Sequence, residues 1–116
     1  MFYRNVTISG TGSELPKDIL SNKKIEEGTN TTDEWIQNSL GINERRVAKI
    51  DSVSDLGTKA ALKAIKSAQI DKEDIDLIVV ATSSPERISP STACTIHKKL
   101  GIKKDVPSFD INAVCA

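Results

Sequence analysis

The feature that most constrains the fold is a run of apolar and mostly β-branched residues, Leu77-Ile78-Val79-Val80-Ala81-Thr82. A continuously apolar strand is typical of a sheet covered on both faces, whereas a strand with one face in water alternates apolar and polar residues. Polar segments bound the run, residues 71–74 before it and a Ser-rich loop, residues 83–89, after it. The run therefore predicts a central strand of a parallel sheet.

Helical periodicity is found on both sides of this strand. Between residues 53 and 68, apolar residues fall on one half of a helical wheel and lysines on the other. The apolar half holds Val53, Leu56, Ala60, Ala61, Ala64, Ile65 and Ala68, and the opposite half holds Lys59, Lys63 and Lys66. The alanines predict close approach to a sheet, and the lysines predict a solvated face. A second helix is predicted from its cap at Ser91 to Gly101, followed by a last strand over residues 108–112.

A first strand is predicted near the N-terminus, where Val6 and Ile8 alternate with polar residues before Gly10-Thr11-Gly12. A short helix is predicted over residues 21–27. Strands that alternate with helices predict an α/β fold with a mostly parallel sheet and flanking helices. In such sheets the chemistry collects outside the carboxyl ends of the strands, and Cys115 directly follows the last predicted strand.

Another helix is predicted by Thr31 and Glu34, which have the spacing of a capping box, and it ends at Gly41. Trp35 is the one tryptophan of the chain and lies in the first turn of this helix. From the residues alone, Trp35 is explained as a hydrophobic anchor for the helix.

Composition excludes several classes of protein. The 116 residues are 38% apolar and 3% aromatic, which favours one soluble domain with an aliphatic core, and 16 basic residues balance 16 acidic ones. A net charge of zero argues against nucleic-acid binding. No apolar run approaches the roughly 20 residues that span a bilayer, and no signal peptide is recognised, so we expect a cytoplasmic protein with free thiols.

Cys115 is the strongest candidate for chemistry. A thiol between a strand and a following helix lies near unpaired N–H groups that favour the thiolate, the nucleophile of covalent acyl transfer. The alternative is a buried cysteine that packs as a small hydrophobe. The chain ends without a cap or polar tail after Cys115, which leads us to expect a truncated protein, residues 1–116 being one part of it.

Six collinear segments carry a resemblance to a known family. They are Gly12-Ser13-Glu14-Leu15-Pro16, Thr32-Asp33-Glu34-Trp35-Ile36, Gly41-Ile42 with Glu44-Arg45, Leu77-Ile78-Val79-Val80-Ala81-Thr82, Pro90-Ser91 with Leu100-Gly101-Ile102, and Phe109-Asp110 leading to Ala113-Val114-Cys115-Ala116. Together they resemble the β-ketoacyl-acyl carrier protein synthase III family over essentially the whole chain. Each segment is weak by itself, and the six in order are specific.

The resemblance implies the first half of a thiolase-like fold and a decarboxylating Claisen condensation that initiates fatty-acid synthesis. Cys115 would accept an acyl group from acyl-CoA, and malonyl-acyl carrier protein would supply the attacking carbanion. Trp35 would stack on the adenine of coenzyme A, with Thr31 near the same nucleotide. Further implications are a homodimer, no permanently bound cofactor or metal, and a catalytic histidine and asparagine from a second half that this chain lacks.

Two departures from the family pattern concern the substrate. Ser39-Leu40 replaces an Arg-Thr-type pair, which removes a cation that would face the coenzyme A phosphates. Ser89 replaces an aromatic residue that reaches the acyl pocket in acetyl-using members. A serine there leaves room for a longer or branched acyl group, and it is equally explained as a turn former.

Other assignments stay open. Related enzymes that make polyketides, quinolones or hydroxymethylglutaryl-CoA share the acyl transfer, and a non-catalytic half-domain that pairs with a partner belongs to a different class. His97 is the one histidine and lies mid-helix on an apolar stripe, so we leave it out of the site. Cys94 has metal-ligand spacing to His97 but lacks further ligands, so a structural role is expected for it.

Overall fold

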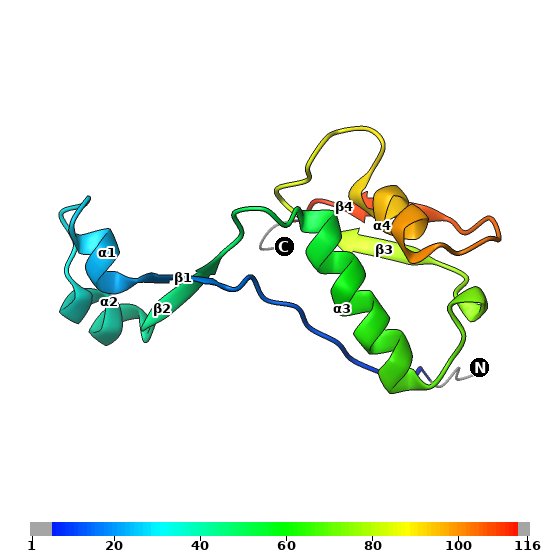
Figure 1. The fold of residues 1–116 in the computed structure, drawn as a ribbon, viewed down its shortest axis with the longest axis horizontal. Coiled ribbons are helices and arrows are strands. Elements are labelled where there is room, and N and C mark those ends of the chain that lie inside the picture. The colour runs from blue at the N-terminus through cyan, green and yellow to red at the C-terminus, as the bar shows by residue number, and fades with distance from the viewer. Residues whose placement is uncertain (1–5, 114–116) are drawn as a thin grey trace, which may run out of the picture. The chain divides into compact units, whose positions relative to one another are not determined.

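The computed structural model describes residues 6–113 of the chain. Along the chain these residues form β1 (Asp18–Ser21), α1 (Asn22–Glu26), α2 (Asp33–Leu40), β2 (Glu44–Val47), α3 (Val53–Ala68), the 3-10 turn η1 (Lys72–Asp74), β3 (Ile78–Ala81), α4 (Thr92–Leu100) and β4 (Ser108–Ile111) (Figure 1). Leu15–Asp51 form one compact unit, called the smaller unit below. The chain on either side of it forms the larger unit.

The larger unit is built on the parallel pair β3 and β4, in which Ile78 lies opposite Ser108 and Ala81 opposite Ile111. Helix α4 connects the two strands, as a parallel pair requires. The buried core comprises Ile96, Leu100, Ile102 and Val106, with Ala61, Ile65, Ile75, Ile78 and Val80 packed against it. The predictions of a parallel β3, of the last strand and of an aliphatic core are confirmed.

One face of this sheet stays open in the described residues. Ile78 and Val80 face the core, whereas Val79 is 43% exposed and Phe109 and Ile111 of β4 are 46% and 44% exposed. The predicted cover on both faces is therefore wrong for the described part of the chain. The apolar residues of β3 alternate between a packed face and an open one.

The two long helices begin and end where the sequence predicts. Ser52 caps α3 and forms a capping box with Asp55, and the helix ends at Gln69, which has a φ of 57°. Ser91 caps α4, which ends at Gly101 with a φ of 65°. Glycine adopts this left-handed conformation without a steric penalty, so Gly101 ends the helix without backbone strain.

The predicted first strand is not formed. Val6 and Ile8 are 94% and 84% exposed, and residues 6–9 pair with no strand among the described residues. A strand needs a partner for its N–H and C=O groups, so alternation alone does not make one. Downstream, Gly10 crosses α3 so closely that a Cβ on it would lie 2.5 Å from the Ala64 carbonyl oxygen. The alanine face of α3 thus receives a glycine segment in place of a sheet.

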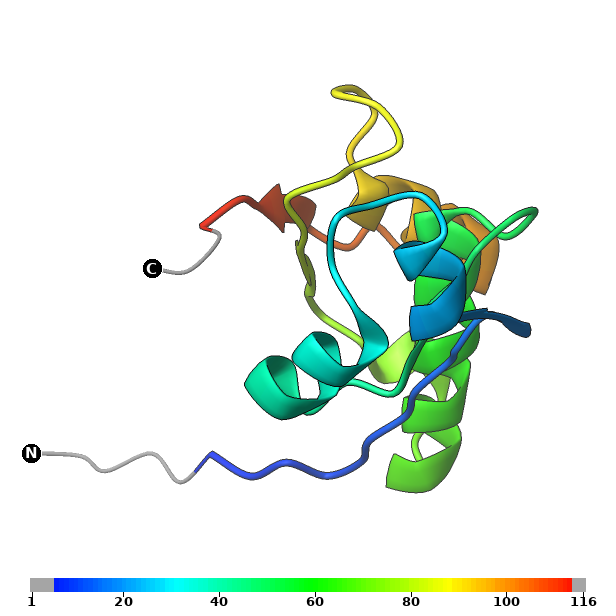
Figure 2. The same ribbon diagram turned by 90° about the vertical axis from the view of Figure 1, so that its left-hand side faces the viewer.

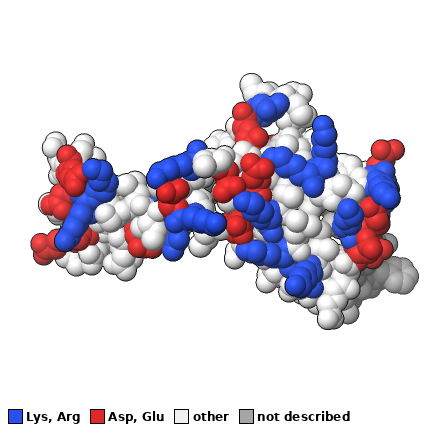
Figure 3. Space-filling model, viewed as in Figure 1, with Lys and Arg blue, Asp and Glu red and all other residues white. Residues whose placement is uncertain are grey.

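The lysine face of α3 is only partly a solvated face. Lys63 donates to the Ser13 carbonyl oxygen at 2.8 Å and pairs with the Glu14 carboxylate. This lysine therefore fastens the N-terminal segment to α3. On the face of the molecule shown in Figure 3, basic and acidic side chains are interspersed.

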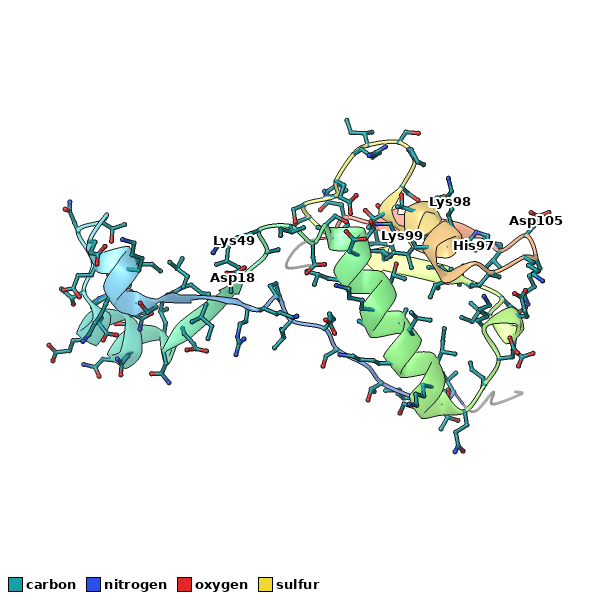
Figure 4. The ribbon with its side chains drawn as sticks, viewed as in Figure 1. Asp18, Lys49, His97, Lys98, Lys99 and Asp105 are labelled. Carbon is teal, nitrogen blue, oxygen red and sulfur yellow. The ribbon has the colours of Figure 1, made fainter. Side chains whose placement is uncertain are left out.

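The smaller unit contains a strand pair that the sequence did not predict. β1 and β2 are antiparallel, with Asp18 opposite Val47 and Ser21 opposite Glu44. Lys49, which follows β2, forms an ion pair at 2.7 Å with Asp18 of β1 (Figure 4). Ser21 caps α1, which confirms the predicted short helix.

Helix α2 begins one residue later than predicted. The cap is Thr32, whose hydroxyl accepts the backbone N–H of Trp35 at 3.2 Å. The predicted capping box of Thr31 and Glu34 is therefore wrong, because Thr32 occupies the capping position. The predicted end at Gly41, with a φ of 67°, is confirmed. Across residues 6–113, no helix is both long and apolar enough to cross a membrane.

Candidate functional site

The Trp35 pocket lies in the smaller unit, where the loop before α2 meets the first turn of that helix. It has a volume of about 550 Å³ and is lined by Thr29, Asn30, Thr31, Thr32 and Trp35. The indole of Trp35 is 55% exposed, which is unusual for a side chain that would otherwise anchor a helix. An accessible indole face suits a flat heteroaromatic ring.

Thr31 adds a polar group to this pocket. Because Thr32 caps the helix, the Thr31 hydroxyl does not bond to the N–H groups of the first turn. Its oxygen is buried and has no hydrogen-bond partner among the described residues. A buried polar atom without a partner is costly. The structure thus brings together Thr31 and Trp35, the two residues for which the family resemblance implies nucleotide binding.

A buried asparagine holds the framework of the Trp35 pocket. Asn22 is 1% exposed and lies at the start of α1. Its amide nitrogen donates to the Asp33 carboxylate at 2.8 Å and to the Ile42 carbonyl oxygen at 2.6 Å. Its amide oxygen accepts from Arg45 at 2.7 Å. We call these four residues the Asn22 network; it joins α1, α2, β2 and the turn after α2.

Asp33 is ionised within this network. Hydrogen bonds from Gln37 and Asn22 lower the pKa of its carboxyl group, against an opposing effect of burial. A carboxylate in the first turn also interacts favourably with the positive end of the α2 dipole. Asp33 therefore stabilises the turn of α2 that presents Trp35.

A second pocket lies at the carboxyl ends of β3 and β4, the position where the sequence predicts chemistry. It has a volume of about 250 Å³ and is lined by Ala81, Thr82, Ser83, Ile111 and Ala113. The Thr82 N–H donates to the Ile111 carbonyl oxygen at 3.0 Å and so continues the ladder beyond the strands. Cys115, the predicted nucleophile, lies outside the described residues, two positions after Ala113.

Asp110 fixes α4 against β4 beside this pocket. Its carboxylate accepts the backbone N–H groups of Thr92 at 2.7 Å and Ala93 at 2.8 Å. Burial opposes ionisation, but the bonds from Ala93 and Thr92 outweigh it, and the pKa of Asp110 lies below its usual value. Sequence patterns did not identify this carboxylate because its partners are 17 and 18 residues away.

Comparison with known proteins shows which proteins the chain is similar to. No family model matches the chain. The β-ketoacyl-[acyl-carrier-protein] synthase III of Clostridium acetobutylicum is 47% identical over 111 residues, which cover 96% of this chain and 34% of that protein. Over nearly its whole length, the chain is similar to the β-ketoacyl-[acyl-carrier-protein] synthase III family. It spans about a third of the length of the curated relatives that it matches.

Solved structures of the synthase III family support the same assignment. The 3-oxoacyl-[acyl-carrier-protein] synthase III of Aquifex aeolicus VF5 has a TM-score of 0.87 and 43% identity, covering 91% of this chain and 34% of its own. The priming β-ketosynthase of the R1128 polyketide pathway has a TM-score of 0.85 and 32% identity, covering 91% and 32%. The predicted α/β, thiolase-like fold class is confirmed.

His97 and Cys94 make contacts that are typical of structural residues. A ring nitrogen of His97 lies 3.2 Å from the Lys104 carbonyl oxygen, in the loop that follows α4 (Figure 4). Cys94 is an exposed free thiol whose sulfur lies 3.4 Å from the Ser108 carbonyl oxygen. Within residues 6–113, no group of three His, Cys, Asp or Glu side chains is placed to hold a metal ion.

Proposed function

We propose that this protein is a β-ketoacyl-[acyl-carrier-protein] synthase III that condenses an acyl-CoA with malonyl-acyl carrier protein to initiate fatty-acid synthesis. The observation that carries the proposal is the Trp35 pocket, in which an exposed indole lies beside the unpartnered Thr31 hydroxyl. The names of the relatives support the reaction type. Family resemblance supports a cytoplasmic homodimer.

In the proposed reaction the Cys115 thiolate attacks the carbonyl carbon of acyl-CoA. The bond to the coenzyme A sulfur breaks, coenzyme A leaves as a thiol after taking up a proton, and the acyl group stays on Cys115. Malonyl-acyl carrier protein then loses carbon dioxide, and the carbanion attacks the acyl-cysteine carbonyl. A carbon–carbon bond forms and the Cys115 thiolate is released.

The residues of the Trp35 pocket are proposed to bind the nucleotide end of acyl-CoA. The indole of Trp35 would stack on the adenine, and Thr31 would lie near the same nucleotide. Stacking on an aromatic side chain contributes about 1–3 kcal/mol per base. The pocket would therefore lower the KM for acyl-CoA without taking part in the chemistry.

The proposal is tested in two steps with the full-length protein. After incubation with acyl-CoA, peptide mass spectrometry should find the acyl group on Cys115, and Cys115→Ala should abolish the label while Cys94→Ala keeps it. Label on Cys94, or label that survives Cys115→Ala, contradicts the assignment. Trp35→Ala should raise the KM for acyl-CoA about tenfold, and leave the KM for acyl-pantetheine, which has no adenine, unchanged.

A second candidate keeps the nucleophile and changes the acyl group. The similarity to a priming β-ketosynthase of a polyketide pathway, at a TM-score of 0.85, supports it. Ser89, in place of an aromatic residue, leaves space for a larger acyl chain. Rates of Cys115 acylation with acetyl-CoA and with four- or five-carbon branched acyl-CoA distinguish the two candidates.

A further inference from the structure

The loop of residues 83–91 connects the second pocket to helix α4. It begins at Ser83, which lines the pocket at the carboxyl ends of β3 and β4, and ends at Ser91, the cap of α4. Residues 83–90 are exposed throughout, and Ile88 is 99% exposed. The loop projects from the larger unit and is drawn in yellow in Figures 1 and 2. Buried apolar contacts therefore do not explain how its middle is held.

A carboxylate near the middle of the loop supplies a fixed point. Glu86 accepts the backbone N–H of Ser54 in the first turn of α3, although the two residues are 32 positions apart. Ser54 is completely buried, so this anchor point is rigid. The unpaired N–H groups of a helix N-terminus favour a negative charge, so the site suits a carboxylate.

Helix α4 reinforces the same contact. The ammonium group of Lys99 donates to the Ser54 hydroxyl at 2.6 Å and to the Asp55 carboxylate at 2.7 Å. Lys99 thus pairs with Asp55 and also lowers the pKa of Glu86 through its charge. Hydrogen bonds from Ser54, together with the charge of Lys99, lower the pKa of Glu86 against the effect of burial. Glu86 therefore remains an anion at neutral pH.

We propose that Glu86 is a positioning residue that fastens the 83–91 loop to the start of α3 and thereby fixes the rim of the pocket at the ends of β3 and β4. If that pocket receives the acyl group, as the proposed function requires, the loop position sets which acyl chains are accepted. The inference that the loop position selects the acyl chain rests on the proposed function. The inference that Glu86 anchors the loop does not.

The anchor is tested in the full-length protein by hydrogen–deuterium exchange at the Ser54 amide, whose N–H donates to Glu86. Glu86→Ala should accelerate exchange there about tenfold, because a hydrogen bond to a charged group is lost, and should leave the amides in the middle of α3 and α4 unchanged. Glu86→Gln keeps an acceptor of the same shape and should restore much of the protection. Arg87→Ala, an exposed neighbour in the same loop, is the matched control. Exchange in Glu86→Ala equal to that of the parent protein overturns the anchor.

The positioning role is tested by selectivity. The ratio of kcat/KM for acetyl-CoA to that for a branched five-carbon acyl-CoA should change at least fivefold in Glu86→Ala, stay near the parent value in Glu86→Gln, and be unchanged in Arg87→Ala. A loosened loop with an unchanged ratio overturns the positioning role. A parent protein that is not acylated at Cys115 refutes the proposed function, and the exchange experiment still decides the anchor.

Discussion

Replacement of Asn22 by alanine should remove most of the stability of the smaller unit and leave the stability of the larger unit unchanged. The substitution removes three hydrogen bonds of a side chain that is 1% exposed, to Asp33 at 2.8 Å, to the Ile42 carbonyl at 2.6 Å and from Arg45 at 2.7 Å. Two of the three involve a charged group. Water cannot replace these bonds without opening the space between α1 and α2.

The magnitude follows from the partners that are left behind. Asp33 keeps its bond from Gln37 at 2.7 Å, and Arg45 is only half-buried, so both recover part of the loss from other contacts or solvent. At about 1 kcal/mol for each lost bond, the total cost is about 3 kcal/mol. Folded proteins are stable by about 0.05–0.15 kcal/mol per residue, which gives roughly 2–6 kcal/mol for a unit the size of Leu15–Asp51. The substitution therefore removes most of the stability of this unit.

Native-state hydrogen exchange and tryptophan fluorescence measure the effect directly. The amides of Ile36 and Gly41, bonded in α2 at 3.0 and 2.9 Å, should lose protection in Asn22→Ala, whereas amides of α4 should keep it. Trp35 is the one tryptophan in the sequence, so its emission should shift towards that of a solvated indole. Gln37→Ala, which removes an exposed bond to the same carboxylate, is the control. Parent-like protection of α2 in Asn22→Ala would refute the reasoning.

Two further predictions concern the larger unit. Lys99→Met should raise the pKa of Asp55, since the bond from Lys99 is the largest cause of its lowered pKa. Because the pKa of Asp55 in the folded protein is below the ordinary carboxyl value of about 4, its ionised form stabilises the fold at pH 7 and this contribution is lost as the pH falls below 4. The decrease in unfolding free energy caused by Lys99→Met, measured with urea, should therefore be smaller below pH 4 than at pH 7. A decrease that does not depend on pH contradicts this prediction. Gly10→Ala should cost about 1–3 kcal/mol, because its Cβ would lie 2.5 Å from α3 backbone atoms. Gly28→Ala, whose Cβ meets nothing closer than 3.9 Å, is the matched control, and equal urea midpoints for the two variants would contradict the close approach.

The sequence predicts elements whose signals are local. Helix α3 has a periodic apolar face and a capping serine next to it, and its bounds, Val53–Ala68, agree with the prediction. Helix α4 lies between Ser91 and Gly101 for the same reason. Strand β3 is recognised by a continuous apolar run, and its parallel pairing follows from the helix that connects it to β4.

Elements that depend on distant partners are predicted poorly. The segment around Val6 has the alternation of a strand but lacks a partner in the described residues. β1 and β2 have a partner, yet each is only four residues long. Two of the four residues of β1 and three of the four of β2 are polar, and neither strand alternates apolar and polar residues. The predicted cap of α2 is wrong for another reason. Thr31 and Thr32 are adjacent in the sequence, and only the backbone geometry determines which of them caps the helix.

The same division between local and distant signals applies to the candidate site. Family motifs identify Thr31 and Trp35, but no local pattern identifies Asn22 or Glu86, whose partners are 11 to 32 residues away. Both side chains act on exposed segments where apolar burial is small, so a few polar bonds determine the local structure. The hydrophobic core of the larger unit contains neither residue. Substitutions at these two positions should therefore alter a pocket while leaving that core intact, a result that loss of a core side chain would not give.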